Sequence, residues 1–524
     1  MAERVSEGIA TSPDQVARED DGDRAQRDLR EATVHGLRWV STGRAIVEVM
    51  MMGSLVVLAR LIPPAAFGPY AVAVVVQELA IGIQGQGVGS ALVQRKTVSR
   101  EHLQAGQALG LVTGLLMTGL TYLAASLLIR PVFGAPAASL VALSSPLFLI
   151  YAIGTVPFAT LRRRFAFRVL SILDIANTSV RLSVSIGLAI AGLGAKSLII
   201  AAVAGALVFN LGALVSAPPP LPRFRRGPVR DLLDYGLSAS LAAISWVGFR
   251  NCDYGIIAAR VGTLQAGLYF RAYTLAIEYQ RKVSDVMVTV AFPVLARSSG
   301  PDQLQALRGQ MVRVLTTVLF PLLTLLAVTA PVLVPWLLGP AWAPVVVPTQ
   351  ILALGGASTL VIDSTGVVLM SSGRSRAMLG FGLGHFLVYG ITVWFVAPNG
   401  IEAVAISAAV VHTVFVFVSY ALMVRGSVAA SLRHVWTDVA PATLSSVALA
   451  AVAVPASVAL SAAHAPAFGQ LVLVTAGAAV AYLATLRLAF PAAWRDLVST
   501  VSRVVPIHRL PRRRGGLVEA RTAG

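Results

Sequence analysis

The chain has 524 residues, of which 56% are hydrophobic and only 13% are charged, and its mean hydropathy is +0.76. These values exclude an ordinary soluble domain. A net charge of +18 would suggest nucleic-acid binding in a soluble protein, but here the basic residues lie in short loops between long apolar segments, which indicates a membrane protein without a nucleic-acid partner. The single cysteine, Cys252, excludes an intrachain disulfide and a thiolate metal cluster.

Apolar segments long enough to cross a bilayer as helices recur along the whole chain. A membrane-spanning helix needs about 20 such residues. The sequence predicts an all-α polytopic protein with about 14 transmembrane helices, over 42–62, 69–92, 104–129, 138–160, 171–192, 197–217, 233–259, 264–295, 311–335, 345–370, 378–397, 402–424, 439–461 and 469–490. An even number of spans places both termini on the same side of the membrane.

Loops rich in arginine alternate with loops that have almost none. The rich loops together hold 18 Arg or Lys and are 94–102, 161–170, 218–232, 297–313, 371–377 and 425–434. The alternate loops, near 60–68, 130–137, 193–197, 260–263, 336–344, 397–401 and 462–468, hold only Arg60, Arg130, Lys196 and Arg260. Short loops with excess Lys and Arg stay in the cytoplasm, so both termini are predicted to be cytoplasmic.

The two ends of the chain are polar. Residues 1–35 hold nine acidic residues and five arginines, without the apolar core of a signal peptide, and we expect a disordered cytoplasmic tail there. Residues 491–524 form a basic cytoplasmic tail that includes Arg512, Arg513 and Arg514. Basic segments beside a membrane are attracted to anionic lipids, which we expect as partners.

The chain also resembles itself at a spacing of about 200 residues. Gly36-Leu37 aligns with Gly236-Leu237, and Ala59-Arg60 aligns with Ala259-Arg260. After a slip of one residue, the segment 68–73 aligns with 267–272. This pattern predicts two six-helix lobes related as parallel repeats, an N-lobe over 36–217 and a C-lobe over 233–424, joined by a proline-rich linker over 218–232 and followed by two extra helices over 439–490.

Charged side chains inside predicted spans are costly, roughly 2.5–3.5 kcal/mol at a helix centre, so they usually face a bundle interior or a wet cavity. The first two spans carry Arg44, Glu48 and Glu78, and the seventh carries Arg250 and Asp253. The pairs Arg44 with Glu48 and Arg250 with Asp253 also fit intrahelical ion pairs. Both interpretations stay open.

The eighth span is the most highly charged. Arg271, Glu278, Lys282 and Asp285 are spaced by seven, four and three residues, which places them on one face of an α-helix. Alternatively, Arg271 extends to the external surface and the later residues emerge into the cytoplasm. We predict that Arg44, Arg250, Arg271 and Lys282 bind an anionic substrate in a cavity, and that Glu48, Glu78, Asp253 and Glu278 provide charge pairing or ion coupling.

Three motifs resemble one family. They are the segment 58–70, Leu-Ala-Arg-Leu-Ile-Pro-Pro-Ala-Ala-Phe-Gly-Pro-Tyr, the segment 91–96, Ala-Leu-Val-Gln-Arg-Lys, and the segment 161–168, Leu-Arg-Arg-Arg-Phe-Ala-Phe-Arg. Together they resemble bacterial polysaccharide or O-antigen flippases of the multidrug/oligosaccharidyl-lipid/polysaccharide exporter superfamily, over roughly residues 34–490.

The resemblance implies a transporter of the bacterial inner membrane, without cofactors, that moves polyprenyl-pyrophosphate-linked oligosaccharides to the outer leaflet for surface polysaccharide synthesis. It leaves open a partnership with a polysaccharide polymerase or glycosyltransferase complex and coupling to Na⁺ or H⁺. The alternatives are a multidrug antiporter or a lipid II flippase of the same superfamily, and a membrane polysaccharide polymerase. No nucleotide loop, nucleophile elbow or zinc-protease motif is present in the sequence, so we do not expect an enzyme.

The predicted topology is testable by thiol labelling. In a cysteine-free background, single cysteines within 218–232 should react with a membrane-impermeant maleimide only after the cells are opened. Labelling of this segment in intact cells would overturn the topology.

Overall fold

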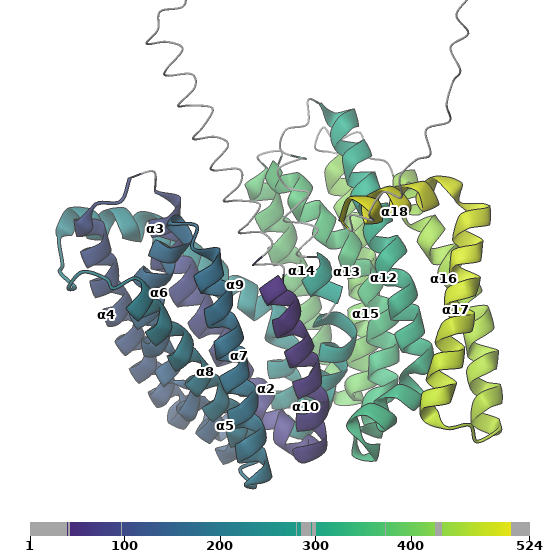
Figure 1. Ribbon diagram of the computed structural model, residues 1–524, viewed down its shortest axis with the longest axis horizontal. Helices are drawn as coiled ribbons and strands as arrows, with labels where there is room; N and C mark the ends of the chain where they lie inside the picture. The colour runs from purple at the N-terminus through teal and green to yellow at the C-terminus, as the bar shows by residue number, and fades with distance from the viewer. Residues whose placement is uncertain are drawn as a thin grey trace, which may run out of the picture. The chain divides into compact units, whose positions relative to one another are not determined.

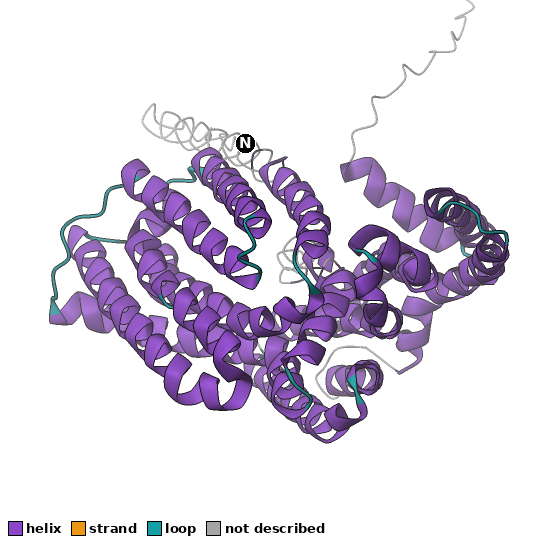
Figure 2. Ribbon diagram, turned by 90° about the horizontal axis from the view of Figure 1, so that it is seen from below, coloured by secondary structure: helices purple, strands orange, loops and turns teal. Residues whose placement is uncertain are grey.

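The computed structural model describes residue 39 and the ranges 42–95, 97–278, 280–284, 300–371, 374–424 and 432–504, together with residue 295. The first 35 residues and the tail beyond 504 therefore lie outside the described residues. The described part is helical and contains no strand (Figures 1 and 2). Because hydrocarbon offers no hydrogen bonds, a chain this apolar pairs its backbone groups inside helices.

A first helix covers 42–61. The elements that follow it in the described residues are α2 (Pro64–Gln84), η1 (Gly85–Gly89), α3 (Ser90–Gln94), α4 (Arg100–Ala124), η2 (Ala125–Ile129), α5 (Arg130–Ser144), α6 (Pro146–Arg163), α7 (Phe167–Ile190), α8 (Ala195–Ser216), α9 (Arg226–Arg260), α10 (Thr263–Tyr273), η3 (Thr274–Glu278), α12 (Pro301–Leu338), η4 (Pro340–Val345), α13 (Val346–Ser371), α14 (Ser375–Val396), η5 (Ala397–Asn399), α15 (Ile401–Val424), α16 (Leu432–Ala462), α17 (Ala467–Ala489) and α18 (Pro491–Val504).

Each of the fourteen predicted spans falls on helix where it is described, but ten stretches of the described residues are long and apolar enough to cross a membrane. One of them, Arg100–Arg163, has 64 residues and covers two predicted spans. The chain turns within it at Gly134, whose φ of +85° suits a residue without a Cβ. The predicted spans 42–62, 233–259 and 264–295 are not among the ten. The protein is therefore a multi-pass helical membrane protein, and the count of fourteen stays a prediction.

The chain divides into two compact units. Unit 1 comprises Met1–Arg271, Val334–Val345 and Gly390–Val404, and unit 2 comprises Ala272–Leu333, Val346–Tyr389 and Ala405–Gly524. The described residues of the predicted N-lobe all lie in unit 1, which also contains α9. The boundaries of the predicted lobes stay a prediction, since compactness does not identify repeats.

Loops of the same predicted side meet within unit 1. The guanidinium of Arg163 donates hydrogen bonds to the carbonyls of Leu92, at 3.0 Å, and Arg95, at 2.5 Å. Arg95 in turn forms an ion pair with Asp231 at 3.0 Å. These contacts join the arginine-rich loops 94–102, 161–170 and 218–232 at one end of the helices.

His102 reinforces this end of unit 1. Its Nε2 lies 3.3 Å from the Asp231 carboxylate, and its hydrogen bond, followed by the charge of Arg95, lowers the pKa of Asp231. The carboxylate is therefore charged at neutral pH and its ion pairs persist. They would be lost only as the pH falls through the lowered pKa of Asp231.

Two glycines at equivalent positions of the repeat touch each other in unit 1. A Cβ on Gly68 in α2 would lie 1.9 Å from the carbonyl oxygen of Thr263, and a Cβ on Gly267 in α10 would lie 2.4 Å from the backbone nitrogen of Gly68. The starts of α2 and α10 can approach this closely only because both residues lack a side chain.

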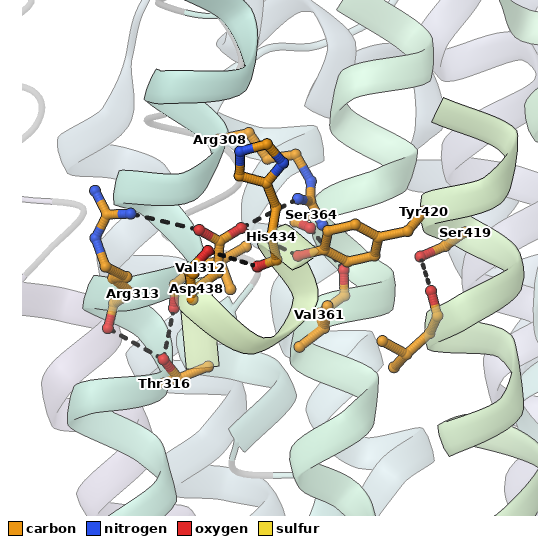
Figure 3. A network of polar contacts seen from close by, with 12 residues as sticks. Arg308, Val312, Arg313, Thr316, Val361, Ser364, Ser419, Tyr420, His434 and Asp438 are labelled. Atoms are coloured by element: carbon orange, nitrogen blue, oxygen red, sulfur yellow. Dashed lines mark hydrogen bonds and ion pairs between the residues drawn. The ribbon is translucent and has the colours of Figure 1, made fainter. Parts of the chain in front are cut away.

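In unit 2, a buried charge network joins α16 to α12 and α15 (Figure 3). Asp438, at the start of α16, is 2% exposed and forms an ion pair at 3.5 Å with Arg308 of α12, which is completely buried. The hydroxyl of Tyr420 in α15 donates to Asp438 at 3.1 Å, and its ring lies 4.2 Å from the Arg308 guanidinium carbon.

The same network reaches the last helix. Arg313 lies 3.4 Å from Asp438 and 3.5 Å from Asp496 of α18, which runs across the end of the α16–α17 pair in Figure 1. Arg308 and Arg313 fall in the predicted loop 297–313, but α12 already begins at Pro301, so most of this loop is helix. Within this segment Arg308 is buried, because α15 and α16 cover it.

Substituting Gly68 tests the backbone contact. Gly68→Ala should lower the stability of the purified protein by about 1–3 kcal/mol, because the new methyl group forces α2 and α10 apart. Thermal unfolding in detergent would measure the change. Gly53→Ala is the matched control, since a Cβ there has nothing within 4 Å. An unchanged melting temperature for Gly68→Ala would show that the two backbones separate without cost.

Removing one partner of the buried ion pair should be far more damaging than removing both. Asp438→Asn should cost about 3–5 kcal/mol, because Arg308 is left buried without a counter-charge, whereas the double variant Arg308→Met, Asp438→Leu should recover most of that loss. Asp496→Asn, at a side chain that is 30% exposed, should cost less than about 1 kcal/mol. Equal stability of Asp438→Asn and Asp496→Asn in thermal unfolding would contradict the network.

Candidate functional site

The predicted substrate residue Arg44 lies near an acidic residue of another helix. Its side chain is exposed on the first helix, and it interacts electrostatically with the carboxylate of Asp174 in α7. Glu48, one turn further along the first helix, is half-buried. The charge of Arg44 is therefore balanced at least in part across helices, and an intrahelical pair with Glu48 is not its whole environment.

More charged groups gather around Asp174. Tyr151 in α6 lies near enough to Arg181, Glu78 and Asp174 for their charges to act on its hydroxyl. Arg181 lies two turns after Asp174 on α7, and Glu78 is half-buried on α2. We name the set Arg44, Glu78, Tyr151, Asp174 and Arg181 the charge cluster of unit 1.

Close packing of α7 on α8 holds Arg181 in place. A Cβ on Gly205 of α8 would lie 2.3 Å from the side-chain oxygen of Asn177 and 3.3 Å from the Cβ of Arg181. The small residue lets α7 lie directly against α8. The cluster thus combines two carboxylates, two guanidinium groups and a phenol on four packed helices, an arrangement that can bind an ion or the charged end of a substrate.

Asp174 was not among the predicted site residues. It is the one acidic residue of the predicted span 171–192 and precedes Arg181 by seven residues, which places both on one helical face. That spacing was the available signal. What the sequence could not show was the approach of Arg44, because no periodicity relates residues of different helices.

The predicted pair of α9 differs in burial between its two members. Asp253 is 1% exposed, and one of its carboxylate oxygens accepts a hydrogen bond from the backbone N–H of Tyr254 at 2.9 Å. Arg250 is half-buried. These two residues lie in unit 1 with the charge cluster.

The predicted polar face of the eighth span is interrupted. Arg271 lies in α10 and unit 1, whereas Glu278 and Lys282, both half-buried, lie in unit 2. Between them, Thr274–Glu278 forms a π-helical turn. Because such a turn holds about one residue more than an α turn, positions seven apart across it no longer share a face. The inference that Arg271 and Glu278 lie on one face is therefore wrong.

Arg271 is covered by aromatic rings. Its guanidinium carbon lies 4.2 Å from the ring centre of Phe67 and 5.0 Å from that of Trp342, and the residue is 4% exposed. Snorkelling of Arg271 to the surface is thus not observed. Two positions after Lys282 in the sequence, Ser284 donates to Asp363 at 3.0 Å, and two positions before it Gln280 donates to the carbonyl of Gly356 at 3.0 Å.

Metal binding finds no support in the described residues, which contain no group of three or more His, Cys, Asp and Glu placed to hold an ion. The polar groups that do converge are those of the charge cluster.

Comparison with known proteins identifies the family. A model of the polysaccharide biosynthesis protein family matches residues 57–347, more than half of the chain. The lipopolysaccharide biosynthesis protein WzxC of Escherichia coli is 23% identical over 416 residues, which cover 78% of this chain and 84% of WzxC. The teichuronic acid biosynthesis protein TuaB of Bacillus subtilis is 24% identical over 323 residues, 60% of this chain and 66% of TuaB.

Solved structures share the fold at low sequence identity. The lipid II flippase MurJ in an inward closed conformation has a TM-score of 0.72 and 11% identity, covering 88% of this chain and 99% of that one. A multidrug resistance transporter in an inward-facing conformation has a TM-score of 0.60 and 13% identity, covering 72% of this chain and 94% of that one. The chain therefore belongs to the polysaccharide biosynthesis protein family, whose members are multi-pass membrane transporters and not enzymes.

Proposed function

We propose that the protein is a flippase that moves polyprenyl-pyrophosphate-linked oligosaccharide units from the cytoplasmic to the outer leaflet of the bacterial cytoplasmic membrane, by alternating access. The observation that carries the proposal is the charge cluster of unit 1, because guanidinium groups held among membrane helices suit a pyrophosphate. Arginine can bind phosphate oxygens through paired, charge-assisted hydrogen bonds.

Arg44 and Arg250, both in unit 1, are the proposed contacts of the pyrophosphate. While the site is empty, the positive charges of the basic residues would be balanced by Glu48, Glu78, Asp253 and Glu278. In this proposal both termini are cytoplasmic, the basic tail is attracted to anionic lipids, and the protein works with a polysaccharide polymerase or glycosyltransferase complex.

A second candidate is an ion-coupled antiporter. The observation that favours it is the equal number of acidic and basic groups in the charge cluster, since Glu78 and Asp174 offer carboxylates that can exchange a proton or hold Na⁺. Coupling and flipping are compatible, because an ion gradient can drive export. A lipid II flippase differs only in the cargo.

The arginines are tested by substitution in a strain that depends on this gene for its surface polysaccharide. Arg44→Ala and Arg250→Ala should each reduce export by roughly ten- to a hundredfold, the equivalent of the 1.5–3 kcal/mol typical of a hydrogen bond to a charged group. Lysine at the same positions should restore part of the export, because it keeps the charge but not the planar fork.

Arg164→Ala, in an exposed part of the loop 161–170, is the matched control and should export normally. Protein level in the membrane is measured in parallel. Normal export by the double variant Arg44→Ala, Arg250→Ala at unchanged protein level would remove these residues from the mechanism. Transport of cationic drugs that depends on Glu78, without polysaccharide export, would favour the antiporter.

A further inference from the structure

The arginines aligned by the internal repeat, Arg60 and Arg260, each contact the tip of a helical hairpin from later in the chain. We define tip 1 as 334–345, between α12 and α13, and tip 2 as 390–404, between α14 and α15. Both tips belong to unit 1, although the rest of α12 to α15 belongs to unit 2. Each tip contains a loop that is predicted to be external. The turns that follow Arg60 and Arg260 are also predicted to be external.

Arg60 completes the end of α12 in tip 1. The helix ends at Leu338, and Gly339 leaves the helical path with a φ of +106°, so the last carbonyls have no donor within the helix. Arg60 supplies two, since its Nε donates to Leu337 at 3.0 Å and its Nη2 donates to Trp336 at 2.5 Å. A cation at the C-terminus of a helix also interacts favourably with the helix dipole.

Trp342 secures tip 1 from the other direction. It is 1% exposed, and its indole N–H donates to the carbonyl of Ala59 at 2.8 Å. Its ring centre lies 5.2 Å from that of Phe67, and Arg271 lies over both rings. Trp342 and Arg271, both almost completely buried, thus pack against the turn between the first helix and α2.

Tip 2 is held more loosely. The guanidinium carbon of Arg260 lies 4.9 Å from the ring centre of Trp394, and both side chains are exposed. A cation–π contact at an exposed site contributes little. Tip 1 is therefore the stronger attachment.

We propose that tips 1 and 2 form an external latch, held by Arg60, Trp342 and Arg271 at tip 1 and by Arg260 at tip 2, which is closed in this conformation and must release for cargo to leave on the outer side. This inference rests on the proposed function, because alternating access requires unit 2 to move and both tips continue into helices of unit 2. The latch consists of a few hydrogen bonds and ring contacts, so it can open and reclose without unfolding a helix.

Thiol labelling tests the latch without a measurement of cargo transport. Ala59→Cys in a Cys252→Ser background is the reporter, because Ala59 is 4% exposed and accepts the bond from Trp342. In intact cells, Arg60→Ala and Trp342→Phe should each raise its labelling rate by a membrane-impermeant maleimide roughly five- to tenfold, since each loses hydrogen bonds that favour the closed latch.

The matched control is Arg130→Ala, which removes an exposed arginine from another predicted external loop and should leave the rate unchanged. Arg260→Ala should have a smaller effect than Arg60→Ala. Equal labelling of the reporter with and without Arg60 and Trp342 would overturn the latch.

Locking the latch separates it from the proposed function. Arg60→Cys and Leu337→Cys, joined by a cleavable thiol crosslinker, should stop export, and cleavage of the linker should restore it. Normal export by the fully crosslinked protein would overturn the proposal. If labelling responds to Arg60 and Trp342 but no polysaccharide is carried, the latch stands and the proposed cargo fails.

Discussion

The contact between Gly68 and Gly267 is the constraint on which the arrangement of unit 1 depends. Because neither residue has a Cβ, the backbones at the starts of α2 and α10 touch. Phe67 immediately precedes the first glycine, and Arg271 follows the second by one helical turn, so the contact brings ring and guanidinium within 4.2 Å. Trp342 then packs against this pair. A larger side chain at either glycine would displace all three residues.

Membrane-spanning helices were predictable from the sequence because hydrocarbon imposes a simple requirement on the backbone. A long apolar run must be helical, and the alternation of arginine-rich and arginine-poor loops predicts which loops share a side of the membrane. Contacts of Arg163 and Arg95 join loops that are predicted to be cytoplasmic, and Arg60 contacts tip 1, which contains a loop predicted to be external. The repeat drawn from Gly68 and Gly267 aligned two residues that prove to be in contact.

Interactions between distant segments were not predictable. Arg308 reads as one more basic loop residue, yet it is completely buried because Asp438, 130 positions later, lies against it. Asp174 carries no mark that relates it to Arg44. The prediction that Arg271 and Glu278 share a face of the eighth span was wrong because a π-helical turn changes the phase of the helix. No pattern of apolar residues predicts that turn. Solved structures at 11–13% identity show the fold alone, so the proposed cargo depends on the charges of this chain.

The pairing of Arg308 with Asp438 has an evolutionary consequence. The arginine belongs to α12, which the core of the protein needs, while the aspartate belongs to the C-terminal helices. Loss of α16 to α18 would leave Arg308 buried without its counter-charge, whereas Asp438 would keep Arg313 at 3.4 Å if Arg308 were lost. The cost is therefore asymmetric: a chain that sheds the C-terminal helices must also replace Arg308 with an apolar residue, because a buried charge without a partner is strongly destabilising.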